Sequence, residues 1–169
     1  MNELTNIIYA SGIYKNKTIL LTSNTNIVNL VDEIKLIKEA NKMKWTHGYL
    51  TYKIIIENNT NKTYKNAILK ENINNLVVLV EDSIKINENK AIYDYSNQSL
   101  AIHIDEIKPN TKTIVNFSIK KKRNDFFILK NYSILKYDNK EVKSNYITIL
   151  SPLKKETNII DCSTPYWRQ

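Results

Sequence analysis

The alternation of apolar and polar positions is clearest in Tyr49–Asn59, where every second side chain is apolar. A period of two places successive side chains on opposite faces of a β-strand, and Tyr, Thr and Ile favour such a surface. Ile55 interrupts the polar face, which indicates that this face is also partly covered. Gly48 and the Asn-rich sequence after Asn59 supply turns. We therefore predict a strand at the centre of a β-sandwich.

Other short apolar or alternating runs, bounded by Asn-rich and Asp-rich turns, predict further strands. In chain order these are Thr5–Tyr14, Ile19–Val28, Tyr64–Glu71, Leu76–Val80, Ser83–Asn87, Leu100–Ile104, Thr113–Ile119, Phe126–Tyr137 and Tyr146–Leu150. Because the chain has only two Gly and three Pro, Asn and Asp must form most turns that need a positive φ. The predicted core consists of Tyr52, Ile54, Ile56, Leu76, Val78, Ile102, Ile104, Phe117 and Ile134.

The segment Val31–Ala40 is ambiguous from its pattern alone. Val31, Ile34 and Ile37 fall on one face of a helix, and the Glu, Lys and Ala residues in this segment favour helix. On periodicity alone, a helix is predicted there.

Several short motifs occur in an order that resembles the conserved-repeat family called domain of unknown function 11. They begin with Gly48 and the Tyr-Thr-Tyr-like alternation after it, which closes on an Asn pair. They continue with the apolar run Leu76–Val80 before Ser83–Asn87, and with Asn110 after a Pro where the family has Gly. Asn replaces Gly there because it tolerates a left-handed conformation. The remaining matches are Lys38, Glu71, Asn131 and Ser144-Asn145.

This resemblance implies an immunoglobulin-like, non-catalytic domain of the kind found in bacterial surface and spore-associated proteins. It also reverses the helix prediction for Val31–Ala40, because the family's first strand runs into a Lys at the position of Lys38. Taken together, residues 31–150 are predicted to form an all-β, immunoglobulin-like antiparallel β-sandwich. Residues 1–30 then form an N-terminal β-hairpin or strand extension, and residues 151–169 form a C-terminal tail.

The N-terminal extension resembles the closing strands of a preceding repeat. Leu4-Thr5-Asn6 and Tyr14–Lys17 echo Leu129–Asn131 and Tyr137–Lys140, and self-similarity at a long offset is typical of tandem domains. A two-stranded hairpin cannot bury its own face, so this extension needs a host. That host is either the sheet edge of its own domain or a neighbouring subunit. Its predicted assembly residues are Ile7, Tyr9, Ile13, Leu21, Ile27 and Val28.

The tail combines apolar, aromatic and basic side chains that a disordered tail would not need. Because Tyr, Trp and Arg are enriched in interface hot spots, we expect the tail to dock on a protein surface, with an untethered tail as the alternative. Cys162 is the only Cys, so it either forms an intermolecular disulfide or remains a free thiol. The predicted tail interface consists of Ile159, Ile160, Tyr166, Trp167 and Arg168.

The formal net charge of +8 raises the question of a nucleic-acid partner. Lys and Arg are scattered except in the run Lys120–Arg123, which falls where a strand is expected to end. A solvated strand end is the favoured interpretation, and no nucleic-acid partner is predicted. No run reaches the length of a membrane span, and the first residues have no secretory signal pattern. The chain is therefore expected to be made in a cytoplasm, or to be a processed piece.

Candidate catalytic chemistry is sparse in this sequence. His47 and His103 lie far apart, and a structural role is favoured for both over a catalytic or metal-binding one. No phosphate-binding loop, zinc motif or nucleophile elbow occurs. We therefore predict no catalytic residue, no metal ligand and no cofactor, and we predict that the protein is not an enzyme.

The sequence prediction for function is a structural subunit of a bacterial spore-surface or cell-surface assembly, such as a fibre, appendage or coat. It would polymerise by contributing β-strands to copies of itself or to related repeat-domain proteins. The spore surface or another extracellular assembly is the expected location, with the cytoplasm as the alternative. The alternative function is a monomeric adhesion or binding module of a surface protein array.

Overall fold

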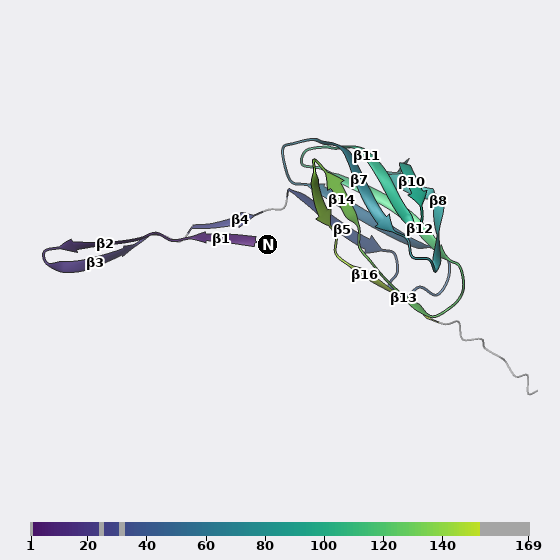
Figure 1. Cartoon of the computed structure of the whole chain (residues 1–169), viewed down its shortest axis with the longest axis horizontal. Helices are drawn as coiled ribbons and strands as arrows, with labels where there is room; N and C mark the ends of the chain where they lie inside the picture. Colours follow the sequence, from purple (N-terminus) through teal and green to yellow (C-terminus); the bar gives the residue numbers. More distant parts are fainter. Residues whose placement is uncertain (1, 24–25, 31–32, 153–169) are drawn as a thin grey trace, which may run out of the picture.

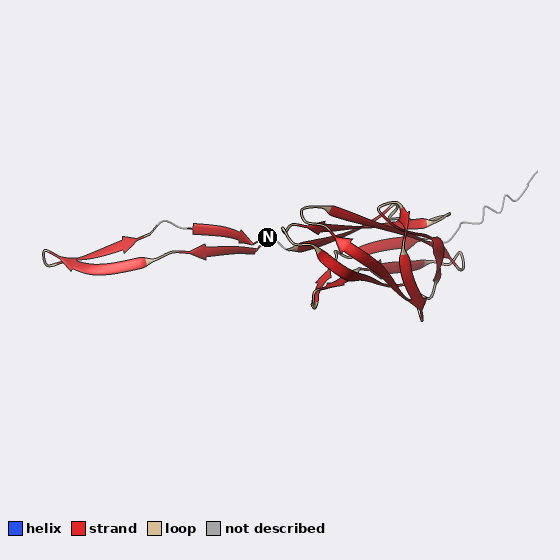
Figure 2. Cartoon of the chain, turned by 90° about the horizontal axis from the view of Figure 1, so that it is seen from above, coloured by secondary structure: helices blue, strands red, loops and turns tan. Residues whose placement is uncertain are grey.

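The computed structural model describes residues 2–23, 26–30 and 33–152, with side chains for 7–23 and 33–152. Two five-stranded antiparallel sheets pack face to face (Figures 1 and 2). The first sheet has the order β5 (Ile34–Ala40), β6 (Leu50–Asn58), β12 (Lys112–Lys121), β8 (Val77–Ile86) and β9 (Asn89–Lys90). The second has the order β10 (Ile92–Ser96), β11 (Ser99–Ile107), β7 (Tyr64–Asn72), β14 (Ile134–Tyr137) and β15 (Lys140–Lys143). The predicted all-β, immunoglobulin-like antiparallel β-sandwich is confirmed.

A smaller pair of strands closes one end of the sandwich. β13 (Phe127–Asn131) pairs with β16 (Ile147–Ser151), and Lys44 forms a parallel bridge to Leu150 on the other side of β16. The neighbouring Trp45 is fully buried, and its ring meets the Phe127 ring edge-on at a centroid distance of 6.4 Å. This strand pair therefore covers an end of the core that the two large sheets leave open.

Asn and Asp form the tight turns, as the low Gly content predicts. Four hairpins are closed by two residues that both have positive φ, the geometry of a type I′ turn, which matches the twist of the flanking strands. These loops are Lys15-Asn16, Asn87-Glu88, Asn97-Gln98 and Asp138-Asn139. Asn110 also has a positive φ, of 52°, so it adopts the conformation predicted for the position where the related family has Gly.

The strand predicted first, now β6, lies between β5 and β12 and buries alternate side chains on its inner face. Periodicity alone predicts a helix in Val31–Ala40, but this segment contains strand β5. The strand predicted there from the family resemblance is therefore confirmed. Of the nine predicted core residues, six are buried: Tyr52, Ile54, Ile56, Ile102, Ile104 and Phe117.

The predicted register is wrong in Leu76–Val80. Leu76 is 41% exposed and precedes β8, Val78 is half-buried, and the core side chains are Val77 and Leu79. This run is apolar on both faces, so its pattern cannot show which face points inward. The separately predicted Ser83–Asn87 continues the same strand through a register shift opposite Asn116–Ser118.

The prediction of a single strand over Phe126–Tyr137 is also wrong. Within this segment the chain leaves the β13–β16 pair and enters the second five-stranded sheet as β14. β13 ends at Asn131, and β14 begins at Ile134 beside β7. Ile134 is consequently only half-buried, and Leu135 takes the core position. The short edge strands β9, β10 and β15 were not predicted.

The N-terminal residues form a narrow two-stranded ribbon outside the sandwich, here called the N-terminal ribbon (Figure 1). β1 (Asn2–Asn6) pairs with β4 (Asn26–Leu30), and β2 (Tyr9–Tyr14) pairs with β3 (Lys17–Thr22). The two long strands predicted here are therefore each divided. At the break, the Ser23 N–H donates to the Ile8 carbonyl at 2.8 Å, and the Ile8 N–H donates to Ser23 Oγ at 2.9 Å.

The register of β8 is tested by a matched pair of Leu truncations. Leu79→Ala empties a buried site and should reduce the free energy of unfolding by about 2–5 kcal/mol. Leu76→Ala removes the same atoms from an exposed site and should cost less than about 1 kcal/mol. Urea denaturation of both variants measures the difference, and equal or reversed losses would show that the register is wrong.

Candidate functional site

Two charged residues occupy inward-facing positions at the ends of apolar alternations. In β5 the buried series Ile34 and Leu36 continues with Lys38, which is 1% exposed. In β7 the buried series Ala67 and Leu69 continues with Glu71, which is 3% exposed. Because β5 and β7 belong to opposite sheets, both side chains point into the space between the layers.

Lys38 and Glu71 form an ion pair across the core. Lys38 Nζ lies 2.7 Å from Glu71 Oε2, and both side chains are completely inaccessible to solvent. The same Nζ lies 4.5 Å from the ring centroid of Tyr52 and 5.8 Å from that of Phe117. The two rings also contact each other, with centroids 5.2 Å apart and planes tilted by 39°, so they cover the buried amine together.

The Glu71 carboxylate accepts hydrogen bonds from two further side chains. Asn131 Nδ2 donates to Oε2 at 3.2 Å, and the Ser133 hydroxyl donates to Oε1. Both residues come from the segment where the chain leaves β13 and enters β14. The departure of this segment from a regular strand thus places two donors on one buried carboxylate.

The Asn131 carboxamide is fixed at both of its polar atoms. Its Oδ1 accepts the Tyr132 N–H at 2.6 Å, and its Nδ2 also donates to the Asn72 carbonyl at 3.2 Å. The orientation of the group is therefore set by backbone contacts as well as by Glu71.

Ser144 and Asn145 hold the surrounding strands together. Asn145 Oδ1 accepts the Lys38 N–H at 2.8 Å, and Asn145 Nδ2 donates to the Lys38 carbonyl at 3.0 Å. Ser144 Oγ accepts the Ser133 N–H at 2.9 Å, and the Ser144 N–H donates to the Ser133 carbonyl at 3.0 Å. These contacts fix the backbone of Lys38 and of Ser133, the two sides of the cluster.

Burial shifts both partners of the ion pair towards their neutral forms. Removal from water lowers the pKa of the Lys38 ammonium, and the attraction of Glu71 opposes this only in part. The same burial raises the pKa of the Glu71 carboxyl, and its contacts with Lys38, Ser133 and Asn131 oppose this only in part. Burial therefore shifts the equilibrium of this pair in the direction of a neutral amine beside a protonated carboxyl group.

A cleft of about 440 Å³ opens beside the cluster. Its lining includes Tyr52, Glu71, Asn72, Asn131 and Tyr146. The polar cluster thus borders an open space through Glu71 and Asn131, whereas Lys38 does not line the cleft.

The sequence motifs named every member of this cluster except Ser133, but they did not predict that the members meet. Lys38, Glu71, Asn131 and Ser144-Asn145 entered only as separate family matches. The period of two carries the missing signal, because it places Lys38 and Glu71 at inward positions where a lone charge is costly. Each therefore requires a buried partner.

The predicted assembly residues of the N-terminal ribbon lie apart from this cluster. Ile7, Tyr9, Ile13 and Leu21 are exposed on the N-terminal ribbon, and the backbones of Ile27 and Val28 lie in β4. Cys162, Ile159, Ile160, Tyr166, Trp167 and Arg168 lie outside the described residues.

The two His residues have separate polar partners. His103 Nε2 lies 2.7 Å from Asp94 Oδ2 across β10 and β11, and His47 Nδ1 lies 2.9 Å from Thr46 Oγ1. Within the described residues, no group of three His, Cys, Asp or Glu side chains is arranged to hold a metal ion. The part of the chain that the structure describes also contains no helix able to span a membrane.

Comparison with solved structures identifies bacterial surface domains of similar fold. The N-terminal domain of the Streptococcus gordonii adhesin Sgo0707 matches with a TM-score of 0.58 and 10% identity, over 80% of this chain and 36% of that one. The full-length major pilin SpaD from Corynebacterium diphtheriae matches with a TM-score of 0.54 and 15% sequence identity. The match covers 78% of this chain and 46% of the pilin. The collagen-binding domain of the Erysipelothrix rhusiopathiae surface protein RspB matches with a TM-score of 0.52 and 14% sequence identity. The match covers 87% of this chain and 56% of that one.

At these identities the comparisons establish the fold alone. This chain spans about a third to just over half of the length of those three chains. No protein-family model matches the sequence, and no curated protein is similar to it. The resemblance to the conserved-repeat family therefore stays a prediction.

The role of Asn145 in fixing β5 predicts a loss of stability on truncation. Asn145→Ala leaves the Lys38 N–H and carbonyl without their side-chain partner and should lower the free energy of unfolding by about 1–3 kcal/mol. Asn124→Ala, at an exposed loop position, should change it by less than about 0.5 kcal/mol. Equal stability of the two variants in chemical denaturation would contradict this role.

Proposed function

We propose that this protein is a non-catalytic structural subunit of a bacterial surface assembly, such as a fibre, appendage or coat on a cell or spore. In this proposal the N-terminal ribbon of one copy adds to a sheet edge of the next copy. The observation that carries the proposal is the exposure of apolar side chains on both faces of the ribbon.

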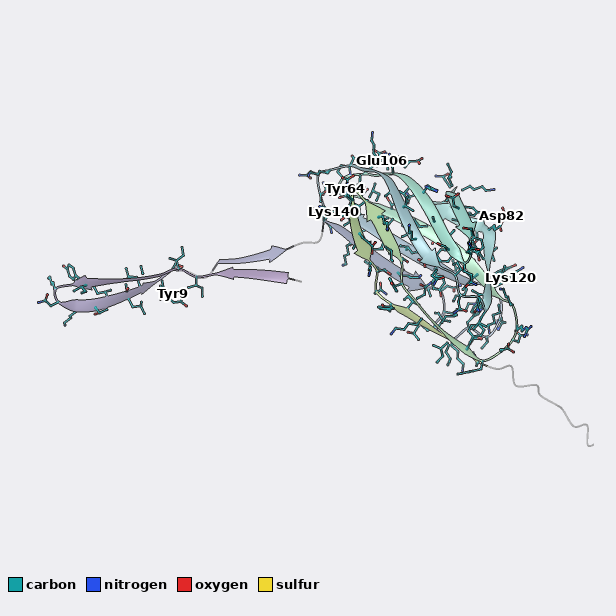
Figure 3. The ribbon with its side chains drawn as sticks, in the orientation of Figure 1. Tyr9, Tyr64, Asp82, Glu106, Lys120 and Lys140 are labelled. Atoms are coloured by element: carbon teal, nitrogen blue, oxygen red, sulfur yellow. The ribbon has the colours of Figure 1, made fainter. Side chains whose placement is uncertain are left out.

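Cross-strand partners in the β2–β3 hairpin share a face, which places Ile13 and Leu20 on one side and Ile19 and Leu21 on the other. Exposure is 79% for Ile13, 68% for Leu20 and 63% for Leu21. Figure 3 shows the labelled Tyr9 side chain on the ribbon, away from the sandwich. Every described side chain from Ile7 to Ser23 is exposed, so no residue that the structure describes covers this apolar surface.

An isolated two-stranded ribbon with this surface is marginal in water. Its two outer edges pair with no other described strand, so their main-chain groups can extend another sheet while the apolar side chains fill pockets there. A second copy of the chain is the occupant that we propose.

The receiving edge in this proposal is β10. The outer edge of β5 is occupied at Lys38 by the Asn145 side chain, and β15 carries Lys140, Glu141 and Lys143, charges that discourage pairing. β10 is an edge strand with exposed Ile92 and Tyr95. It therefore combines apolar side chains with a main-chain edge that no other described strand pairs with.

A ribbon-to-edge contact joins two different surfaces, so it propagates into a filament or ring. The similar fold of a major pilin supports this function, as does the similar fold of an adhesin domain. A monomeric binding module is the second candidate, because the fold is also similar to a collagen-binding domain.

Deletion of residues 1–30 tests the proposal by removing the donor. We expect the full chain to form high oligomers or filaments in light scattering and electron micrographs. The shortened chain should be a folded monomer with the β-sheet circular dichroism signal of the sandwich.

A matched pair of variants separates surface chemistry from truncation. Leu20→Asp with Leu21→Asp should abolish assembly, whereas Thr18→Asp with Thr22→Asp adds the same charge to β3 and should weaken it less. Assembly that survives the deletion would refute ribbon donation. A full chain that is monomeric at every concentration would favour the binding module. Unfolding of the shortened chain would show that the ribbon stabilises its own sandwich and is not donated to another copy.

A further inference from the structure

An amine and a carboxamide meet on one oxygen of the buried cluster. Glu71 Oε2 is 2.7 Å from Lys38 Nζ and 3.2 Å from Asn131 Nδ2. We propose that Lys38 and Asn131 join in an intramolecular isopeptide bond, with Glu71 transferring the protons and ammonia leaving. The reaction occurs once, within the chain, and produces a cross-link between β5 and β13.

Lys38 has the environment that a nucleophilic amine requires. An ammonium has no free electron pair, so the group must first lose a proton. Burial among the Tyr52 and Phe117 rings lowers the pKa of Lys38 and raises the pKa of Glu71, which favours transfer of that proton to the carboxylate. The pair then consists of a neutral amine and a carboxylic acid in contact.

Asn131 is held as the electrophile. When Nζ attacks Cγ, negative charge develops on Oδ1, and the Tyr132 N–H already donates to that oxygen at 2.6 Å. A fixed backbone donor at the oxygen that gains charge stabilises such a tetrahedral intermediate. The hydrogen bond from Nδ2 to the Asn72 carbonyl holds the leaving nitrogen on the opposite side of the group.

The reaction balances without another reagent. The Nζ electron pair forms the bond to Cγ, and the C=O π pair moves onto Oδ1. Glu71 gives its proton to Nδ2 and takes one from Nζ, which is possible because Oε2 contacts both nitrogens. As the C=O bond re-forms, the Cγ–Nδ2 bond breaks and its electron pair leaves with ammonia. The products are a secondary amide and one ammonia molecule.

The surroundings allow ammonia to leave while water stays away from the amine. The aromatic pair covers Lys38, whereas the cleft of about 440 Å³ is lined by Asn72 and Asn131. Ser133 Oγ donates to the other carboxylate oxygen, Oε1, and leaves Oε2 directed at the two nitrogens. Ser133 is therefore a positioning residue for Glu71.

The bond would connect β5, at the start of the sandwich, to β13 near its end. A force applied to the two ends of the sandwich would then be carried by a covalent bond instead of separating the strands of a sheet. This inference does not depend on the proposed function, since a monomeric domain would carry the same cross-link.

Intact mass spectrometry of the denatured full chain tests the proposal. The expected mass is one ammonia below the sequence mass, and a protease digest should contain a branched peptide joining the Lys38 and Asn131 segments. Lys38→Met and Asn131→Ala should restore the full mass expected for each variant. Glu71→Gln should also restore it, because Gln cannot carry the proton. Lys35→Met, on an exposed neighbouring position of β5, should keep the loss.

Two results would overturn the proposal. Wild-type protein with the full sequence mass would show that Lys38 and Glu71 form an ion pair only. Loss of ammonia without a branched peptide would show that an Asn has cyclised on its own backbone. Because the wild-type measurement decides the question, failure of any variant to fold does not affect the outcome.

Discussion

The carboxylate of Glu71 is buried between two sheets, and a buried charge of this kind must be neutralised or paired. The neighbouring structure meets that requirement with Lys38, Asn131 and Ser133. Their positions in turn depend on the break between β13 and β14 and on the Asn145 and Ser144 contacts. One polar group thus fixes the relation between the first strand of the sandwich and its last strands.

A buried ion pair contributes little net stability, because loss of hydration offsets the attraction between its charges. A hydrophobic pair would fill the same space, so stability alone does not account for Lys38 and Glu71. A covalent link between β5 and β13 is an outcome that needs these groups, and it would suit the proposed role in a surface assembly. The proposed assembly through the N-terminal ribbon and the proposed cross-link inside the sandwich do not depend on each other.

Much of the fold follows from local patterns in the sequence. The inner face of β6 follows from strict alternation, and the Asn-rich hairpins follow from the need for positive φ without Gly. The register of Leu76–Val80 does not follow, because both faces of this run are apolar and the pattern does not show which face points into the core. The strand break at Tyr132 and Ser133 depends on a contact with Glu71, some sixty positions earlier, which no local pattern contains. For the same reason Lys38, Glu71 and Asn131 were identifiable in the sequence only as separate motif matches, and only the three-dimensional structure shows that they meet.

A crystal structure of the full chain at atomic resolution would test the central claim, that Lys38 of β5 is joined covalently to Asn131 of β13. Our account predicts continuous electron density from Lys38 Nζ to Asn131 Cγ, with no density for a separate Nδ2. Two separate side chains, each hydrogen-bonded to Glu71 with Asn131 Nδ2 retained, would contradict it.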